Sequence, residues 1–384
     1  MRSARSRVRL VGTAAVSAAL VLCAAPTATA VPDFGSSGSS GSSNGHLRLG
    51  YVNSITVPTG TPFDGFPIGG LSGIDYDSAR GEYVAISDNR GEQGPVRYYS
   101  LRLPLDQAGK LTTAEFTGQT SLLDTNQAPF TPRTADTESI RYLPGSDSLL
   151  YTSEGSARIG LPGFVRETAR DGKFLRDYAL PEAYTPKATP PSGFRDNLGF
   201  EAVTVDRAGT TITAASENAL AQDGPAISDQ VGSQSRFLRI DRVTGAHRGE
   251  FVYDVDPVRL APGEPFVPVS SVNGIGEILA VGDSDYLVLE RNVSAGGGFS
   301  VKIFRTDVHG AENVAGKPVL GGTERKMRKE LVFDFAAAGV NPECIEGITW
   351  GPTGPDGTRT LVLVADDNFG LAGKTTFHLL TVGR

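Results

Sequence analysis

The sequence predicts an all-β fold made of repeated antiparallel sheets, and three observations lead to this prediction. A short motif recurs with its shared position at residues 72, 138, 201, 277 and 346, at intervals of 66, 63, 76 and 69. Each copy is followed, after a polar turn, by a second β-rich run. No long amphipathic helix is evident, because the best candidate, 326–338, has a second half that is typical of a strand. A near-constant period of this kind is typical of a β-propeller.

Each copy of the motif has an acid or serine, a small or apolar residue, an aliphatic residue, a variable residue, and an aromatic residue or valine. The copies lie at residues 71–76, 137–142, 200–205, 276–281 and 345–350. The second runs lie at residues 83–89, 149–155, 213–218, 287–292 and 363–368. Gly, Asn and Asp between the two runs indicate hairpin turns, since these residues tolerate positive φ. With third and fourth strands readable at 97–103, 114–123, 236–241 and 250–255, the chain predicts five four-stranded blades. Six remain possible if one copy has lost its motif.

The closure of the ring is predicted from the two ends of the chain. The fifth copy contains a third strand at 375–382, after which the sequence ends, while a strand-like run at 47–57 precedes the first copy. Pairing these two segments completes the fifth blade and leaves no open sheet edge. We therefore expect a propeller closed by its N- and C-terminal strands.

The first 45 residues have the composition of an export signal and a leader. Four arginines precede an apolar run at 10–25, and Ala28 and Ala30 form the small-residue pattern of a cleavage site. We expect a signal peptide at 1–30, cleaved after Ala30, a flexible Ser/Gly-rich leader at 31–45, and the propeller domain at 46–384. No second long apolar stretch follows. The sequence thus predicts a secreted protein without a transmembrane segment.

The charge balance narrows the possible partners. Cleavage would leave 32 basic and 43 acidic residues, a net charge of −11. An acidic surface repels nucleic acid and anionic membranes, so we expect neither as a partner. We expect a monomer that acts on a small-molecule ester. Cys344 would be the one remaining cysteine, which excludes an internal disulfide, and we interpret it as a buried filler.

Acidic residues recur where each blade would open at one mouth of the central channel. The first strands begin with Glu138, Glu201, Glu277 and Glu346, and with Ser72 in the first copy. The second strands end in Asp88, Glu154, Glu217 and Asp367, with Arg291 aligned in the fourth copy. In an antiparallel hairpin the second strand ends beside the start of the first, so all these side chains should share one mouth.

So many carboxylates in one place predict a bound cation, since like charges raise one another's pKa unless a cation neutralises them. Oxygen ligands suit Ca²⁺, with Mg²⁺ possible, and the lack of a His and Cys cluster in the sequence argues against zinc. Turn asparagines could add carbonyl ligands: Asn89, Asn218, Asn292 and Asn368.

Two other interpretations of these charged residues stay open. The glutamates could instead bond the backbone as repeat-specific staples. Arg291 could pair with carboxylates or present its guanidinium to a phosphate.

As an ordered set, several of these motifs resemble a known family. They are Ser72-Gly73-Ile74-Asp75-Tyr76-Asp77, Ser87-Asp88-Asn89, Glu138-Ser139-Ile140, Phe200-Glu201-Ala202, Ser216-Glu217-Asn218 and Ile345-Glu346-Gly347-Ile348. They resemble the phytase-like domain, "esterase-like activity of phytase", which is common among secreted bacterial proteins. The resemblance runs from about residue 71 to 368 and implies hydrolysis of phosphate or carboxylate esters at a calcium-loaded acidic channel.

The sequence therefore favours a secreted, Ca²⁺-dependent hydrolase of phosphate esters. We expect Glu201, Glu217 and Glu346 to serve as metal ligands or base. The expected substrate contacts come from arginines: Arg90, Arg141 and Arg291. A metal-dependent lactonase or carboxylic-ester hydrolase is the first alternative. The second is a non-catalytic propeller that binds a ligand or envelope partner through its loops at 181–197 and 256–273.

Overall fold

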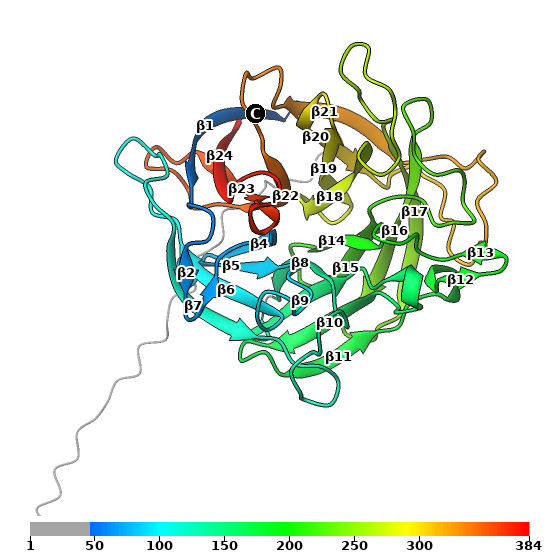
Figure 1. Ribbon diagram of the computed structural model, residues 1–384, viewed down its shortest axis with the longest axis horizontal. Helices are drawn as coiled ribbons and strands as arrows, with labels where there is room; N and C mark the ends of the chain where they lie inside the picture. Colours follow the sequence, from blue (N-terminus) through cyan, green and yellow to red (C-terminus); the bar gives the residue numbers. More distant parts are fainter. Residues whose placement is uncertain (1–46, 144, 384) are drawn as a thin grey trace, which may run out of the picture. The chain divides into compact units, whose positions relative to one another are not determined.

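The computed structural model describes residues 47–143 and 145–383, so the expected signal peptide and leader lie outside the described residues. Five four-stranded antiparallel sheets surround a common centre (Figure 1). The innermost strands are β4 (Leu71–Asp77), β8 (Thr137–Leu143), β14 (Phe200–Val205), β18 (Val272–Ala280) and β22 (Cys344–Trp350). Each packs beside the next, and β22 packs beside β4. The fold is a five-bladed β-propeller, as predicted, and the five four-stranded sheets of the described residues exclude the six-bladed alternative.

Successive strands of each blade lie farther from the centre. The second strands are β5 (Glu82–Ser87), β9 (Ser148–Ser153), β15 (Thr211–Ser216), β19 (Asp285–Ser294) and β23 (Arg359–Asp366). The third strands are β6 (Arg97–Arg102), β10 (Phe164–Ala169), β16 (Ser233–Asp241), β20 (Gly298–Asp307) and β24 (Thr376–Gly383). The outer strands are β7 (Glu115–Ser121), β11 (Phe174–Tyr178), β17 (His247–Val255), β21 (Arg328–Asp334) and β1 (Arg48–Thr56). The blades are numbered 1 to 5 from β4, β8, β14, β18 and β22.

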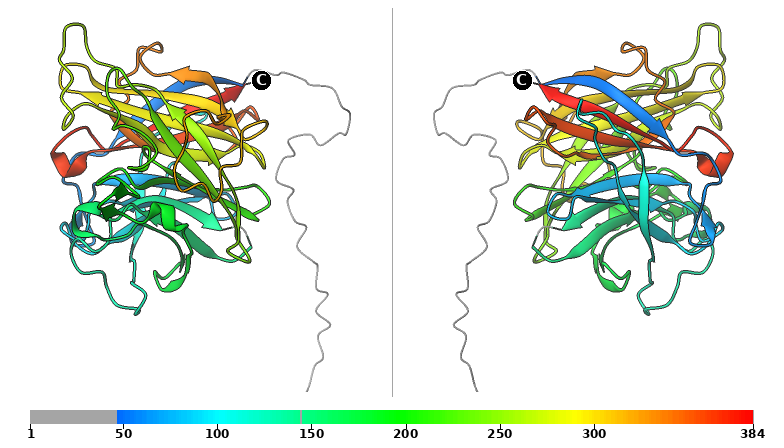
Figure 2. Two further views of the ribbon diagram at one scale, coloured as in Figure 1. Left: turned by 90° about the vertical axis from the view of Figure 1, so that its right-hand side faces the viewer. Right: turned by 90° about the vertical axis from the view of Figure 1, so that its left-hand side faces the viewer.

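Both ends of the described chain meet in blade 5, as the sequence predicts. Arg48 of β1 pairs with Gly383 of β24, and Thr56 pairs with Thr376. Figure 2 shows these two strands side by side. The pairing joins segments that are more than 300 residues apart and leaves blade 5 with its full four strands. Since an open edge invites pairing with other chains, this closure also protects the fold.

Short elements occupy the connections between the strands. They are β2 (Pro62–Phe63), β3 (Phe66–Pro67), β12 (Lys187–Ala188), β13 (Pro191–Ser192) and the 3₁₀ turns η1 (Ala157–Ile159), η2 (Glu182–Tyr184) and η3 (Asn368–Gly370). The segment 326–338, the best helix candidate in the sequence, contains strand β21. In the described part of the chain, no helix is both long and apolar enough to pass through a membrane.

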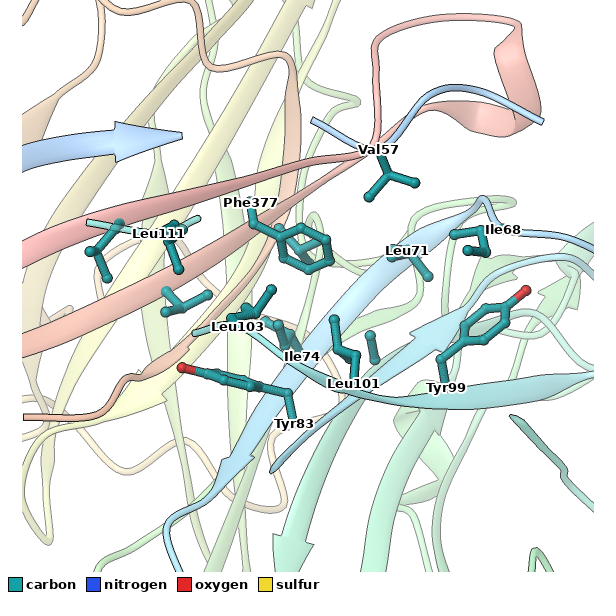
Figure 3. Close-up of a cluster of buried hydrophobic side chains, with 14 residues drawn as sticks. Val57, Ile68, Leu71, Ile74, Tyr83, Tyr99, Leu101, Leu103, Leu111 and Phe377 are labelled. Carbon is teal, nitrogen blue, oxygen red and sulfur yellow. The ribbon is translucent and has the colours of Figure 1, made fainter. Parts of the chain in front are cut away.

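The hydrophobic core lies between neighbouring blades, because each sheet buries aliphatic and aromatic side chains on both faces. One cluster joins blade 1 to blade 5 and contains Tyr83, Leu101 and Phe377 (Figure 3). Tyr99 packs edge-to-face on Phe116, with ring centroids 5.4 Å apart. This packing holds the innermost strands in fixed positions and thereby sets the geometry of the channel.

Candidate functional site

Each innermost strand contains a β-bulge in its first half, and the bulge determines which side chain reaches the channel mouth. In blade 5 the pairing passes from Ile345↔Ala365 to Gly347↔Val364, which leaves Glu346 as the extra residue. Glu201 is the extra residue of blade 3, and Ser72 that of blade 1. In blade 2 the interruption includes Glu138. Bulges re-aim side chains and are frequent beside active sites, which explains how a buried strand presents an acid at its end.

In blade 4 the bulge lies one residue earlier than the sequence repeat predicts. There the pairing passes from Ile275↔Glu290 to Glu277↔Leu289, so Gly276 occupies the bulge. Glu277 therefore lies one position further along than the other glutamates, and a shift of one residue turns a side chain to the opposite face. A second shift occurs in blade 5. Because Ala365 pairs with Ile345, Asp366 rather than Asp367 corresponds to the acids that follow the other second strands.

Nine carboxylates gather at the mouth where the innermost strands begin and the second strands end. We call them the acidic ring: Asp88, Asp136, Glu138, Glu154, Glu201, Glu217, Glu346, Asp366 and Asp367. Electrostatic repulsion links the members across the blades, as between Glu138 and Glu201 or between Asp88 and Glu346. All but Asp88 are at most 7% exposed. The ring is thus a concentration of buried negative charge.

Burial is the main cause of the abnormal protonation in the ring. It raises the pKa of Glu138 and of Glu154 well above the usual range, and repulsion from neighbouring carboxylates adds to the rise. Burial also raises the pKa of Glu217, to about 7, although Arg291 opposes the shift. A carboxyl with such a pKa exchanges its proton near neutral pH. Burial and mutual repulsion therefore favour the protonated form of Glu138, Glu154 and Glu217.

Three members of the ring lie close enough together that they could hold a metal ion. Asp136, Glu138 and Glu154 each offer an oxygen, and these oxygens lie within 4.8 Å of one another. All three side chains are buried. We call them the carboxylate triad. Three hard oxygen donors at this spacing fit Ca²⁺ or Mg²⁺, which take carboxylate and water ligands.

Glycines make room for the acids of the second strands. A Cβ atom on Gly199 would lie 2.6 Å from the Cβ of Glu154, and one on Gly274 would lie 2.4 Å from the side chain of Glu217. The Gly199 N–H also donates to Glu154 Oε2 at 3.0 Å. At the position that Gly199 and Gly274 occupy in their blades, blade 2 has Asp136, the first member of the triad. The local sequence therefore both admits and orients the buried carboxylates.

Arg291 lies inside the ring as a built-in cation. Its guanidinium is 3.4 Å from Glu201 Oε1, 3.4 Å from Glu217 Oε1 and 3.3 Å from Glu346 Oε1. The side chain is only 16% exposed, and it also donates to Cys344 Sγ at 3.7 Å. These contacts neutralise one side of the ring. The carboxylate triad lies outside the set that Arg291 contacts.

Arg90 reaches the ring from the loop after β5. Its Nε donates to Asp136 Oδ1 at 2.7 Å, and its Nη2 donates to Asn197 Oδ1 at 2.7 Å. The same Nη2 lies 3.8 Å from Glu154 Oε1. Arg90 thus contacts two members of the triad, while 42% of its side chain stays exposed.

Two of the predicted site residues lie apart from the ring. Arg141 and Glu277 form an ion pair in the channel, with 2.9 Å between Nη2 and Oε2. Arg141 also donates to the backbone carbonyls of Ile74, Val203 and Ile278, which belong to three other blades. The structure therefore places this pair as a buried link between blades, and Arg141 does not lie at the mouth with the acids.

The remaining predictions have a clear structural outcome. The structure brings together Asp88, Glu138, Glu154, Glu201, Glu217, Glu346, Asp367, Arg90 and Arg291. Sequence reasoning missed Asp136, although it directly adjoins the recognised segment 137–142, and it did not count Asp366, which lies within 363–368, among the predicted ligands. Of the turn asparagines, Asn89 and Asn292 use their amide oxygens to accept backbone N–H groups, from Gly91 and Arg259. Ser72 donates to the Glu138 carbonyl and so joins blades 1 and 2.

The fold and the mouth define a class of protein, a five-bladed propeller whose buried carboxylates converge around one end of the channel. The chain belongs to the phytase-like family, "Esterase-like activity of phytase", whose model matches residues 66–369. Over 162 residues it is 27% identical to an uncharacterized secreted protein of Arthroderma benhamiae. That match covers 35% of this chain and 31% of the relative, so this chain matches less than a third of the relative's length.

Two solved structures share similarity with the chain at low sequence identity. A periplasmic gluconolactonase of Pseudomonas aeruginosa is 14% identical, with a TM-score of 0.35, over 86% of this chain and 94% of that one. The tail fiber of Staphylococcus aureus phage P68 is 12% identical, with a TM-score of 0.37, over 88% of this chain and 52% of that one.

Proposed function

We propose that the protein is an exported, divalent-cation-dependent hydrolase that cleaves esters at the acidic ring, with Ca²⁺ as the ion and phosphate esters as substrates. The observation that carries the proposal is the carboxylate triad, whose three oxygens lie within 4.8 Å of one another and are buried. Membership of a family described by esterase-like activity supports ester hydrolysis. The signal peptide expected from the sequence and the similarity to a secreted protein support an extracellular location.

The triad residues would hold the ion, and the rest of the ring would act around it. A bound divalent cation polarises an ester oxygen and lowers the pKa of a bound water. Glu217 is our candidate for the general base, because burial raises its pKa to about 7 and a base works best near the ambient pH. Glu201 and Glu346 share the Arg291 guanidinium with Glu217 and keep it oriented.

A carboxylic ester or lactone is the second candidate substrate. The observation that favours it is the state of the two arginines that contact the ring. Both are held by carboxylates, Arg90 by Asp136 and Arg291 by Glu201, Glu217 and Glu346. A phosphate ester benefits from free guanidinium groups, whereas a neutral ester carbonyl does not need them. The Arg–carboxylate contacts therefore reduce the preference for phosphate.

The test compares turnover of p-nitrophenyl phosphate, phytate, p-nitrophenyl acetate and a lactone panel, each with Ca²⁺ and with chelator. Variants Asp136→Asn and Glu138→Gln should lose chelator-sensitive turnover. Glu92→Gln is the matched control, because Glu92 is a half-exposed acid that pairs with Arg133 at 2.7 Å. Phosphate turnover supports the first candidate, and turnover of acetate or lactones alone supports the second. Turnover rates that are the same with Ca²⁺ and with chelator on every substrate would refute both candidates.

A further inference from the structure

Arg90 is anchored at its backbone but free at one side of its guanidinium. It follows β5 with a φ of 51°, and its carbonyl accepts the Arg133 N–H at 2.7 Å. The side chain extends over the carboxylate triad and is 42% exposed. Arg291, in contrast, is 16% exposed and contacts three carboxylates. Of these two arginines, Arg90 is therefore the one that has space to move.

The contacts of Arg90 are of two kinds. Its Nε bonds Asp136 Oδ1 at 2.7 Å, and its Nη2 lies 3.8 Å from Glu154 Oε1, so it neutralises two members of the triad. Its Nη2 also bonds Asn197 Oδ1 at 2.7 Å, and Asn197 is an amide outside the triad. A guanidinium beside Asp136 repels a divalent cation that enters the triad, and the repulsion is strong where burial lowers the dielectric. The two cations therefore compete for the same carboxylates.

We propose that Arg90 is a latch, meaning a side chain that occupies the triad when no metal is bound and turns toward the mouth when a divalent cation enters. The released guanidinium then binds the anionic group of the substrate, in the planar two-bond arrangement that arginine forms with phosphate oxygens. Binding of the cation and binding of an anion are coupled in this way, and the coupling acts in both directions. The proposal rests on the proposed metal-dependent function of the same mouth.

The first experiment measures Ca²⁺ affinity by calorimetry on metal-stripped protein. Arg90→Gln removes the competing charge, so it should bind Ca²⁺ about 3- to 10-fold more tightly than the wild type, a range set by the loss of one nearby charge. Arg90→Lys keeps the charge without the planar fork and should lie between the two. Arg133→Gln is the matched control, since it removes an exposed arginine of the same loops, and its affinity should equal that of the wild type. Weaker or unchanged Ca²⁺ binding by Arg90→Gln would overturn the latch.

The second experiment measures the coupling with inorganic phosphate as the probe. In the wild type, saturating Ca²⁺ should increase phosphate affinity about tenfold or more, and Arg90→Gln should lose most of that increase. In a crystal structure of the Ca²⁺ complex, the bond between Arg90 Nε and Asp136 Oδ1 should be broken. An intact 2.7 Å bond beside the ion, or equal coupling in Arg90→Gln, would refute the proposal.

The outcomes separate the latch from the function on which it rests. If the wild type binds no divalent cation, the metal-dependent function and the latch both fail. If the wild type binds Ca²⁺ and Glu138→Gln abolishes that binding, the metal site is confirmed. The Arg90 variants then test the latch independently of the metal site.

Discussion

Arg141 and Glu277 form a buried ion pair, 2.9 Å long, that joins blades 2 and 4 across the channel. Ser139 donates to the same carboxylate at 2.6 Å, and the Val203 N–H donates at 3.2 Å. Glu277 is fully buried, and burial raises its pKa to about 7 despite the attraction of Arg141. The pair satisfies polar groups from four innermost strands, so it fixes the positions of the blades around the acidic ring.

Replacing Glu277 should therefore affect stability and leave metal binding unchanged. Glu277→Ala would leave the Arg141 guanidinium buried without its acid, and such a loss costs about 3–5 kcal/mol of unfolding free energy. Urea unfolding measures this change. The exposed pair of Glu92 and Arg133 provides the control, because Glu92→Ala should cost only about 0–1 kcal/mol. A stable Glu277→Ala variant that has lost Ca²⁺ affinity would instead identify Glu277 as a ligand.

The protonation of the ring predicts how stability depends on pH in the absence of metal. The pKa of Glu217 rises from a usual value of 4.5 to about 7 on folding, and burial raises the pKa of Glu138 and Glu201 as well. These carboxyls bind more protons in the folded than in the unfolded state, so stability falls as pH rises between the two pKa values. With chelator present, the Tm should decrease from pH 5 to pH 8.

Ca²⁺ should flatten this dependence, because a bound cation favours the ionised carboxylates and stabilises the folded state. Differential scanning calorimetry with Ca²⁺ and with chelator measures both curves. Parallel curves, or a metal-free Tm that increases toward pH 8, would contradict the electrostatic account of the ring.

Arg291 should set the pH at which Glu217 becomes active as a base. The pKa of Glu217 is about 7, and Arg291 lowers it, so Arg291→Gln should raise this pKa further. The acidic limb of the kcat/KM profile would then move to higher pH. Arg291→Lys keeps the positive charge and should show a smaller shift. An acidic limb that stays in place, or moves to lower pH, would remove Glu217 from the role of base.

The sequence predicted the fold well because the repeat reports directly on strands and turns. The motif predicted the five blades, since period and polar turns survive divergence between the copies. The strand-like runs at 47–57 and 375–382 predicted the closing pair of strands. It also predicted most of the acidic ring, because hairpin geometry places the end of one strand beside the start of the next. The prediction of Ca²⁺ stays a proposal, supported by the triad.

The differences between the predicted and the observed alignment of the repeat come from single-residue shifts that the motif cannot reveal. Gly276, and not Glu277, occupies the bulge of blade 4, and Asp366, and not Asp367, corresponds to Asp88. A bulge adds one residue to a strand and turns the side chains that follow it to the opposite face. The exact position of the bulge depends on packing between strands. Asp136 was missed for a related reason, because three other blades have glycine at its position.

The central claim, that the carboxylate triad binds a divalent cation, is tested most directly by calorimetric titration of metal-stripped protein with Ca²⁺. The wild type should bind at the triad, Glu138→Gln should bind at least tenfold more weakly, and Glu92→Gln should equal the wild type. Removing one charge from a crowded ring should not lower the metal-free Tm of Glu138→Gln, which distinguishes loss of a ligand from misfolding. Absence of binding by the wild type, or equal binding by Glu138→Gln, would contradict the claim.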